Sequence, residues 1–158
     1  MIKTKIKGVL KYARIIKPVQ TKFGADVYQL TLSVTKSVFD MFKLNLSENE
    51  GLDMTKYRIP HKVQDDGSID LYFQVRAKGR KKDGEEFDKA PKLIGKDKKP
   101  IDKTTIGNGS QVVVDLVVFN YDFEKDGKTV SGIQLQPKVI QVNELVKFEP
   151  KKPILGDF

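Results

Sequence analysis

Residues 69–80 read IDLYFQVRAKGR, and apolar and polar side chains alternate along the whole stretch. Successive side chains of a β-strand point to opposite faces, so this period of two predicts one strand from Ile69 to Arg80. Its apolar face, from Ile69 to Ala77, is expected to lie against a core. The opposite face would carry a tyrosine, an amide and cations, namely Tyr72, Gln74, Arg76, Lys78 and Arg80.

The same alternation predicts further strands on both sides of this one. We expect them at about 9–17, 27–34, 111–123 and 130–142, with a loop between Lys17 and Gly24. In 111–123 one face is aliphatic, whereas the opposite face ends in three aromatic residues, Phe119, Tyr121 and Phe123. Pro137 indicates an edge or a bulge in the last strand, because proline lacks the N–H that a central strand donates.

One helix and several turns are expected between the strands. Apolar residues recur at helical spacing from Val38 to Leu46, behind Thr35 or Ser37 as the N-cap. Turns are indicated at 65–67 and 125–128, and the lysine-rich segment 79–103 indicates a long excursion with a hairpin tip at 81–84. This order favours a mainly β fold, a five-stranded Greek-key OB-fold barrel with one capping α-helix and a long basic loop or hairpin excursion.

Positive charge is concentrated in two segments of the chain. The net charge is +8, and residues 1–22 carry seven basic and no acidic side chains, while residues 76–103 carry eleven basic and six acidic ones. Such clustering favours a polyanionic partner, nucleic acid before an acidic membrane, over a lysine-rich surface that only aids solubility. The chain has no cysteine, and no apolar stretch indicates a signal peptide or a membrane span, so we expect a cytoplasmic protein.

The sequence offers little for catalysis or metal binding. The single histidine, His61, follows a proline in a connecting segment and is interpreted as a surface or hydrogen-bonded residue. Asp65 and Asp66 abut Gly67, which favours a turn over a magnesium site. The glycines within 106–110 precede a strand rather than a helix, so they indicate a tight turn and not a phosphate-binding loop. We therefore expect no enzyme activity, no cofactor and no metal.

Cations and aromatic rings on the same strand faces are the stronger signal. A protein that binds single strands needs cations along the phosphates and flat rings on which unpaired bases stack. For Phe119, core packing is the alternative role. The predicted nucleic-acid-binding residues are those of the two outer strand faces and a second group near the N-terminus: Tyr72, Gln74, Arg76, Lys78, Arg80, Phe119, Tyr121, Phe123, Lys11, Tyr12, Arg14 and Lys17.

Several pieces of the chain carry a family resemblance through their order and spacing. They are Ile16-Lys17-Pro18, residues 27–33 and 71–77, Ile106-Gly107-Asn108-Gly109-Ser110, Asn120-Tyr121-Asp122-Phe123, Gln134-Leu135-Gln136 and residues 142–146. In these pieces the chain resembles the single-stranded DNA-binding proteins of tailed bacteriophages, of the phage T-seven type. The resemblance implies an OB fold capped by a helix, with DNA in a basic groove lined by stacking aromatics.

The resemblance also assigns roles to individual residues. It implies a stacking tyrosine at Tyr121 and another aromatic at Phe123. Arg76 stands where the family has its second stacking tyrosine, although a guanidinium plane can also stack on a base. Such proteins typically end in an acidic segment closed by an aromatic residue. Here Asp157 and Phe158 match, but the acidic run is missing.

From these features we expect a binding domain over residues 1–148 and a flexible tail over 149–158. The resemblance implies that the tail, through Asp157 and Phe158, contacts the phage DNA polymerase and helicase/primase. A homodimer is compatible with the pattern, and no membrane is implied.

The sequence thus favours a non-catalytic, sequence-nonspecific single-stranded DNA-binding protein. It would coat single strands during phage DNA replication and recombination, in the cytoplasm of the infected bacterial host. Two alternatives stay open. One is an RNA-binding OB module, which would need contacts to the 2′-hydroxyl. The other is a phage structural or adaptor protein with an OB-like barrel, whose basic patches neutralise acidic partners.

Overall fold

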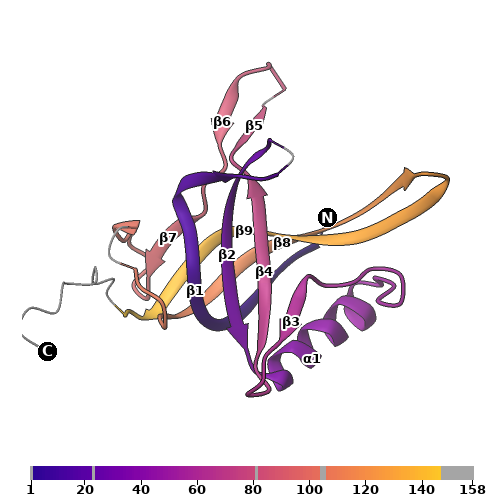
Figure 1. The fold of residues 1–158 in the computed structure, drawn as a ribbon. Helices are drawn as coiled ribbons and strands as arrows, with labels where there is room; N and C mark the ends of the chain where they lie inside the picture. The colour runs from indigo at the N-terminus through magenta and orange to yellow at the C-terminus, as the bar shows by residue number, and fades with distance from the viewer. Residues whose placement is uncertain (1, 23, 81, 104–105, 147–158) are drawn as a thin grey trace, which may run out of the picture.

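Five strands form a closed barrel in the computed structural model, which describes residues 2–22, 24–80, 82–103 and 106–146 (Figure 1). The strands are hydrogen-bonded in the order β4-β2-β1-β8-β9, and a parallel bridge between Phe73 and Leu135 joins β4 to β9. The predicted mainly β, five-stranded barrel is therefore confirmed. Its strands are β1 (Ile2–Gln20), β2 (Asp26–Val34), β4 (Ile69–Arg76), β8 (Gln111–Lys125) and β9 (Lys128–Glu144).

Shorter elements connect the barrel strands. A helix, α1 (Lys36–Leu44), is continued by a π-helical turn, η1 (Asn45–Asn49), and the strand β3 (His61–Val63) pairs with β4. The predicted N-cap is confirmed, because the Thr35 side chain accepts a hydrogen bond from the backbone N–H of Val38 at 3.2 Å. The basic excursion contains the hairpin β5 (Lys78–Arg80) to β6 (Glu86–Asp88), followed by β7 (Lys92–Gly95) beside β9.

The core follows the period of two. On β4, Leu71, Phe73 and Val75 are at most 1 % exposed, whereas Tyr72 between them is 42 % exposed. The apolar face of α1 contributes Phe39 and Phe42 to the same cluster, so the helix packs onto the barrel as predicted. Each barrel strand therefore divides its side chains between the core and one outer surface.

The first strand is longer than predicted. We expected a strand at 9–17 and a loop from Lys17 to Gly24, but β1 runs from Ile2 to Gln20. Its first part pairs with β8 and its second part with β2, and the two pairings meet at Val9. At the neighbouring Gly8, a Cβ would lie 2.6 Å from the backbone oxygen of Ser33. Pro18 fits within the strand because the pairing with β2 is interrupted between Arg14 and Val19.

The strand predicted over 69–80 is in fact two strands. β4 ends at Arg76 because its partner β2 begins at Asp26, and the backbone oxygen of Asp26 accepts the N–H of Ala77 at 2.9 Å as the last bond of this pairing. The chain then pairs with β6 in a separate two-stranded sheet. Lys78 and the backbone of Arg80 thus belong to the β5–β6 hairpin and not to the barrel face, which corrects the prediction of one continuous outer face.

The hairpin of β8 and β9 projects well beyond the barrel (Figure 1). Residues 121–130, which include its turn, are all exposed. The bulge predicted at Pro137 is confirmed, because Leu116 pairs with Pro137 while Asp115 pairs with Val139, leaving Lys138 as the additional residue. The expected tail at 149–158, with Asp157 and Phe158, lies outside the described residues. In the part of the chain that the structure describes, no helix is long and apolar enough to cross a membrane.

Candidate nucleic-acid interface

One groove on the barrel surface gathers most of the predicted binding residues. This central groove has a volume of about 950 Å³ and is bounded by β1, the β1–β2 loop, β2, β4, β8 and β9. In OB folds, the face of the second and third barrel strands and the loops beside it hold oligonucleotides. Its lining residues are Tyr12, Arg14, Thr21, Lys22, Ala25, Val27, Gln29, Leu30, Thr31, Pro60, Tyr72, Phe73, Gln74, Arg76, Phe119, Tyr121, Ile133, Gln134 and Leu135.

The charge of the central groove is positive. Its described lining includes three cations, Arg14, Lys22 and Arg76, and no carboxylate. Arg76 is the last residue of β4 and Arg14 lies where β1 shifts its register, so different strands bring their cations to one surface. A surface of this sign attracts a polyanion.

Exposed rings lie beside these cations. Four aromatic residues that line the central groove remain between 37 % and 67 % exposed, namely Tyr12, Tyr72, Phe119 and Tyr121. Phe119 is 40 % exposed, so core packing does not describe it. Rings that stay open to solvent beside cations provide the two elements that single-strand binding requires.

Tyr121 is held flat against the neighbouring strand. It pairs with Gly132 of β9, where a Cβ would lie 2.5 Å from Cζ of the tyrosine ring. The absence of a side chain at Gly132 therefore creates the space in which the ring lies. The ring also stacks on Phe123, with centroids 6.0 Å apart and planes at 20°. Phe123 itself is 48 % exposed and supports the ring from outside the central groove.

Asp122, the residue after Tyr121, anchors the projecting β8–β9 hairpin to the segment between α1 and β3. The Tyr57 hydroxyl donates a hydrogen bond to Asp122 at 2.7 Å, and Nζ of Lys56 lies 3.4 Å from the same carboxylate. Ser131 of β9 also donates to Asp122. The hydrogen bond from Ser131, followed by that from Tyr57, lowers the pKa of Asp122 below its usual value. These contacts fix the part of β8 from which Tyr121 points.

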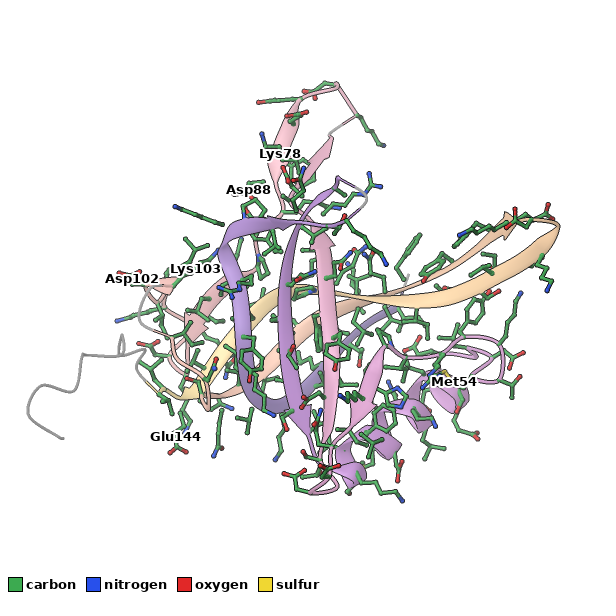
Figure 2. The ribbon with its side chains drawn as sticks, in the orientation of Figure 1. Met54, Lys78, Asp88, Asp102, Lys103 and Glu144 are labelled. Atoms are coloured by element: carbon green, nitrogen blue, oxygen red, sulfur yellow. The ribbon has the colours of Figure 1, made fainter. Side chains whose placement is uncertain are left out.

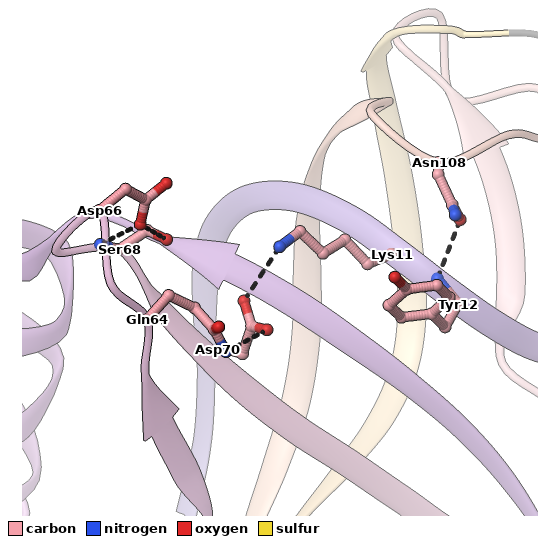
Figure 3. Close-up of polar contacts among 7 residues, drawn as sticks. All are labelled: Lys11, Tyr12, Gln64, Asp66, Ser68, Asp70 and Asn108. Atoms are coloured by element: carbon pink, nitrogen blue, oxygen red, sulfur yellow. Dashed lines mark hydrogen bonds and ion pairs between the residues drawn. The ribbon is translucent and has the colours of Figure 1, made fainter.

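Tyr12 is presented by an unusual backbone conformation. Its φ is 48°, in the left-handed region that residues with a side chain rarely adopt, and it lies at the register shift of β1 between Lys11 and Arg14. The backbone N–H of Tyr12 donates to Oδ1 of Asn108 at 2.9 Å (Figure 3). This turn conformation leaves the ring 67 % exposed over the central groove.

Amide side chains form part of the floor of the central groove. Gln29 of β2 stands opposite Gln74 of β4, and their side chains are hydrogen-bonded at 3.3 Å. Gln134 of β9 lies at the same groove and accepts a hydrogen bond from Gln136 at 2.8 Å. Amides both donate and accept, so they can meet any base edge without selecting one.

Seven of the twelve predicted binding residues line the central groove, and five do not. Lys11 turns away, because its Nζ pairs with Asp70 at 3.3 Å (Figure 3). Lys78 pairs with Glu86 at 3.8 Å on the β5–β6 hairpin, where Figure 2 shows it near Asp88. Phe123 supports Tyr121, Lys17 is exposed on β1, and nothing is described of the Arg80 side chain.

Sequence reasoning missed several lining residues. Thr21, Lys22, Gln29, Thr31 and Gln134 belong to the groove, yet none was predicted to bind. The alternation of β2 already indicated that Gln29 and Thr31 face outward. The strand that lies beside β2 depends on the barrel topology, so the sequence alone did not predict that Gln29 and Thr31 share a groove with β4.

The groups considered for chemistry have ordinary structural roles. Nδ1 of His61 lies 2.6 Å from the backbone oxygen of Ile59, and the ring packs against Phe39. Asp66 accepts hydrogen bonds from Ser68, which lower its pKa and close the predicted turn. Among the described residues, no cluster of histidine, aspartate and glutamate could hold a metal ion.

Several solved structures of phage proteins share this architecture. The single-stranded DNA-binding protein gp2.5 of bacteriophage T7 aligns over 96 % of this chain and 92 % of its own, with a TM-score of 0.58 and 17 % identity. The chain shares the fold of the phage single-stranded DNA-binding proteins.

Two structures of the single-stranded DNA-binding protein from bacteriophage Enc34 have the same fold. The C-terminally truncated protein has a TM-score of 0.60 at 14 % identity, over 94 % of this chain and 88 % of that one. The Enc34 protein in complex with single-stranded DNA has a TM-score of 0.53 at 13 % identity, over 96 % and 89 %. No protein-family model and no curated protein sequence matches the chain.

Proposed function

We propose that this protein binds single-stranded DNA in the central groove, without strong sequence preference. One observation carries the proposal. Four exposed aromatic rings and three cations line the same groove, and no carboxylate stands among its described lining residues. Cations that follow the phosphates and rings that stack on bases are the two elements of nonspecific single-strand binding.

The exposed rings favour single strands over duplex. A stacking ring gains its contact only with a base whose face is free, whereas charge alone favours the denser phosphates of duplex DNA. The amide floor of Gln29, Gln74 and Gln134 supports weak sequence preference, because amides match several base edges.

The cellular role that we propose is coating of single strands during phage DNA replication and recombination, in the cytoplasm of the infected bacterium. The fold shared with phage single-stranded DNA-binding proteins supports this role. The protein would act by binding and not by catalysis. Contacts with phage polymerase and helicase/primase through Asp157 and Phe158, and a homodimer, belong to the same proposal and rest on the sequence resemblance.

The proposal is tested by fluorescence titration with oligo-dT, a duplex of equal length and oligo-U. We expect tighter binding to oligo-dT than to the duplex, with a log–log salt slope of roughly −2 if each groove cation contacts one phosphate. Preference for the duplex would remove the stacking argument, and salt-independent binding would remove the electrostatic one. Tighter binding to oligo-U than to oligo-dT would favour the RNA-binding alternative.

A further inference from the structure

A second groove lies between α1 and the barrel, apart from the central groove. This helix groove has a volume of about 1020 Å³ and is lined by the first strand, the helix and the middle of β8 and β9. It shares no lining residue with the central groove. Its lining residues are Lys3, Thr4, Lys5, Ile6, Lys7, Val38, Met41, Phe42, Asn45, Asp115, Leu116, Val117, Lys138 and Val139.

The helix groove combines an apolar floor with a basic rim. Met41 lines it and is 69 % exposed, so apolar side-chain surface is open to solvent at this groove. Four lysines surround the floor, namely Lys3, Lys5, Lys7 and Lys138. Exposed apolar surface with a mostly positive rim favours an interaction site over a solubilising surface.

The rim has more positive charge than its neighbourhood neutralises. Lys5 pairs with Asp115 at 3.7 Å, and Asp115 is the one carboxylate of the lining. For Lys3, Lys7 and Lys138, no ion pair forms within the part of the chain that the structure describes. Burial, followed by repulsion from Lys89 and Lys3, lowers the pKa of Lys138, so a nearby anion would favour the charged form of this lysine.

We propose that the helix groove binds an acidic segment of a partner protein, with apolar side chains on the floor and carboxylates on the lysine rim. Amphipathic segments bind grooves of this kind through apolar anchors. Nucleic acid fits less well, because the single ring in the described lining, Phe42, is 5 % exposed and offers no stacking surface. A symmetric contact with a second copy would bring the two lysine rims together.

The chain contains a built-in reporter for this proposal. Of its three methionines, Met41 lines the helix groove, whereas Met54 lines a separate shallow pocket with Asp40 and Lys43. Labelling the methionine methyl groups with ¹³C therefore gives an NMR signal from Met41 at the site and a control signal from Met54 on the same molecule, beside the signal of Met1. The probe is a synthetic peptide in which Asp and Glu alternate with Leu and Phe. Its control replaces Leu and Phe by Ser.

We expect the acidic–apolar peptide to shift the Met41 signal saturably and to leave Met54 unchanged. The double variant Lys3→Glu/Lys7→Glu should weaken this binding by roughly tenfold. The control variant Lys96→Glu, which changes an exposed lysine in a turn outside the groove, should leave the binding unchanged. Thermal unfolding of each variant separates lost binding from lost folding, and the exposure of these side chains makes folding of the variants the expected result.

Three results would overturn the proposal. They are no saturable shift at Met41, an equal shift with the serine control peptide, and an equal shift with oligo-dT, which would make the helix groove part of a nucleic-acid path. Tyr121→Ala keeps the two functions separable. If it weakens DNA binding but leaves the peptide response intact, the helix groove acts independently of the central groove.

Discussion

Asn108 accepts a hydrogen bond from the backbone N–H of Tyr12 at 2.9 Å, although the two residues are 96 positions apart in the chain. Asn108 belongs to the turn before β8, and Tyr12 lies in the irregular part of β1. The bond stabilises a left-handed conformation at Tyr12, with φ at 48°, that costs about 1 kcal/mol or more for a residue with a side chain. Strain is thus tolerated at the residue that presents the most exposed ring of the central groove.

The first prediction separates this strain from binding. Tyr12→Ala and Tyr12→Gly both remove the ring, so both should weaken oligo-dT binding to the same extent. Glycine adopts positive φ freely, so Tyr12→Gly should be more stable than Tyr12→Ala by about 1 kcal/mol. For a domain of this size, that difference raises Tm by about 3 °C. Thermal unfolding and titration of both variants check this, and equal stability of the two would show that the backbone is not strained.

The second prediction concerns Tyr121 as a stacking residue. Tyr121→Ala should weaken oligo-dT binding about fivefold to more than a hundredfold, because a base–aromatic stack contributes roughly 1–3 kcal/mol. The salt slope should stay nearly constant, since no phosphate contact is lost. The ring is 37 % exposed, so Tm should change little. A loss of binding that follows an equally large loss of stability would contradict this role.

The third prediction moves the same ring without removing it. Gly132→Ala introduces a methyl group into the space that the Tyr121 ring occupies, so the ring must leave its position. Binding should fall by roughly tenfold, less than full removal of the ring can cost. The double variant with Tyr121→Ala serves as the control, because Gly132→Ala should have no further effect once the ring is gone. Additive effects of the two changes would show that Gly132 acts in some other way.

The fourth prediction compares two cations that sequence alone placed on one face. Arg76 lines the central groove, so Arg76→Ala should weaken binding and reduce the salt slope by about 0.7. Lys78 lies on the β5–β6 hairpin and pairs with Glu86, so Lys78→Ala should change neither quantity appreciably. Titrations at several salt concentrations measure both. Equal losses for the two variants would extend the binding surface onto the hairpin.

Alternation along single strands predicted the barrel well. It assigned Leu71, Phe73 and Val75 to the core and Tyr72 and Tyr121 to the outside, and the structure agrees. Residues 2–8 show the same alternation, because Ile2, Thr4 and Ile6 alternate with lysines, but it was not used to predict the start of the first strand. These lysines were interpreted only as part of the basic segment 1–22, whereas β1 places Lys3, Lys5 and Lys7 at the rim of the helix groove.

Contacts between distant segments could not be predicted in this way. The end of β4 at Arg76 depends on where β2 begins, and the direction of Lys11 depends on Asp70, 59 positions away. The pairing of Gln29 with Gln74 likewise requires the strand order. Periodicity gives the face of a side chain, while the strand that lies beside it is decided by the closure of the barrel.

The alternation of β4 has a consequence for how this protein can change. Eight residues from Ile69 to Arg76 assign every second side chain to the interior, so inserting or deleting one residue would exchange Phe73 and Tyr72 between the two sides. Substitutions at outward positions such as Gln74 leave the interior untouched. The core therefore fixes the length of this strand, while its outer residues are constrained by binding alone, and an alignment of diverged relatives should show gaps in the loops and none within 69–76.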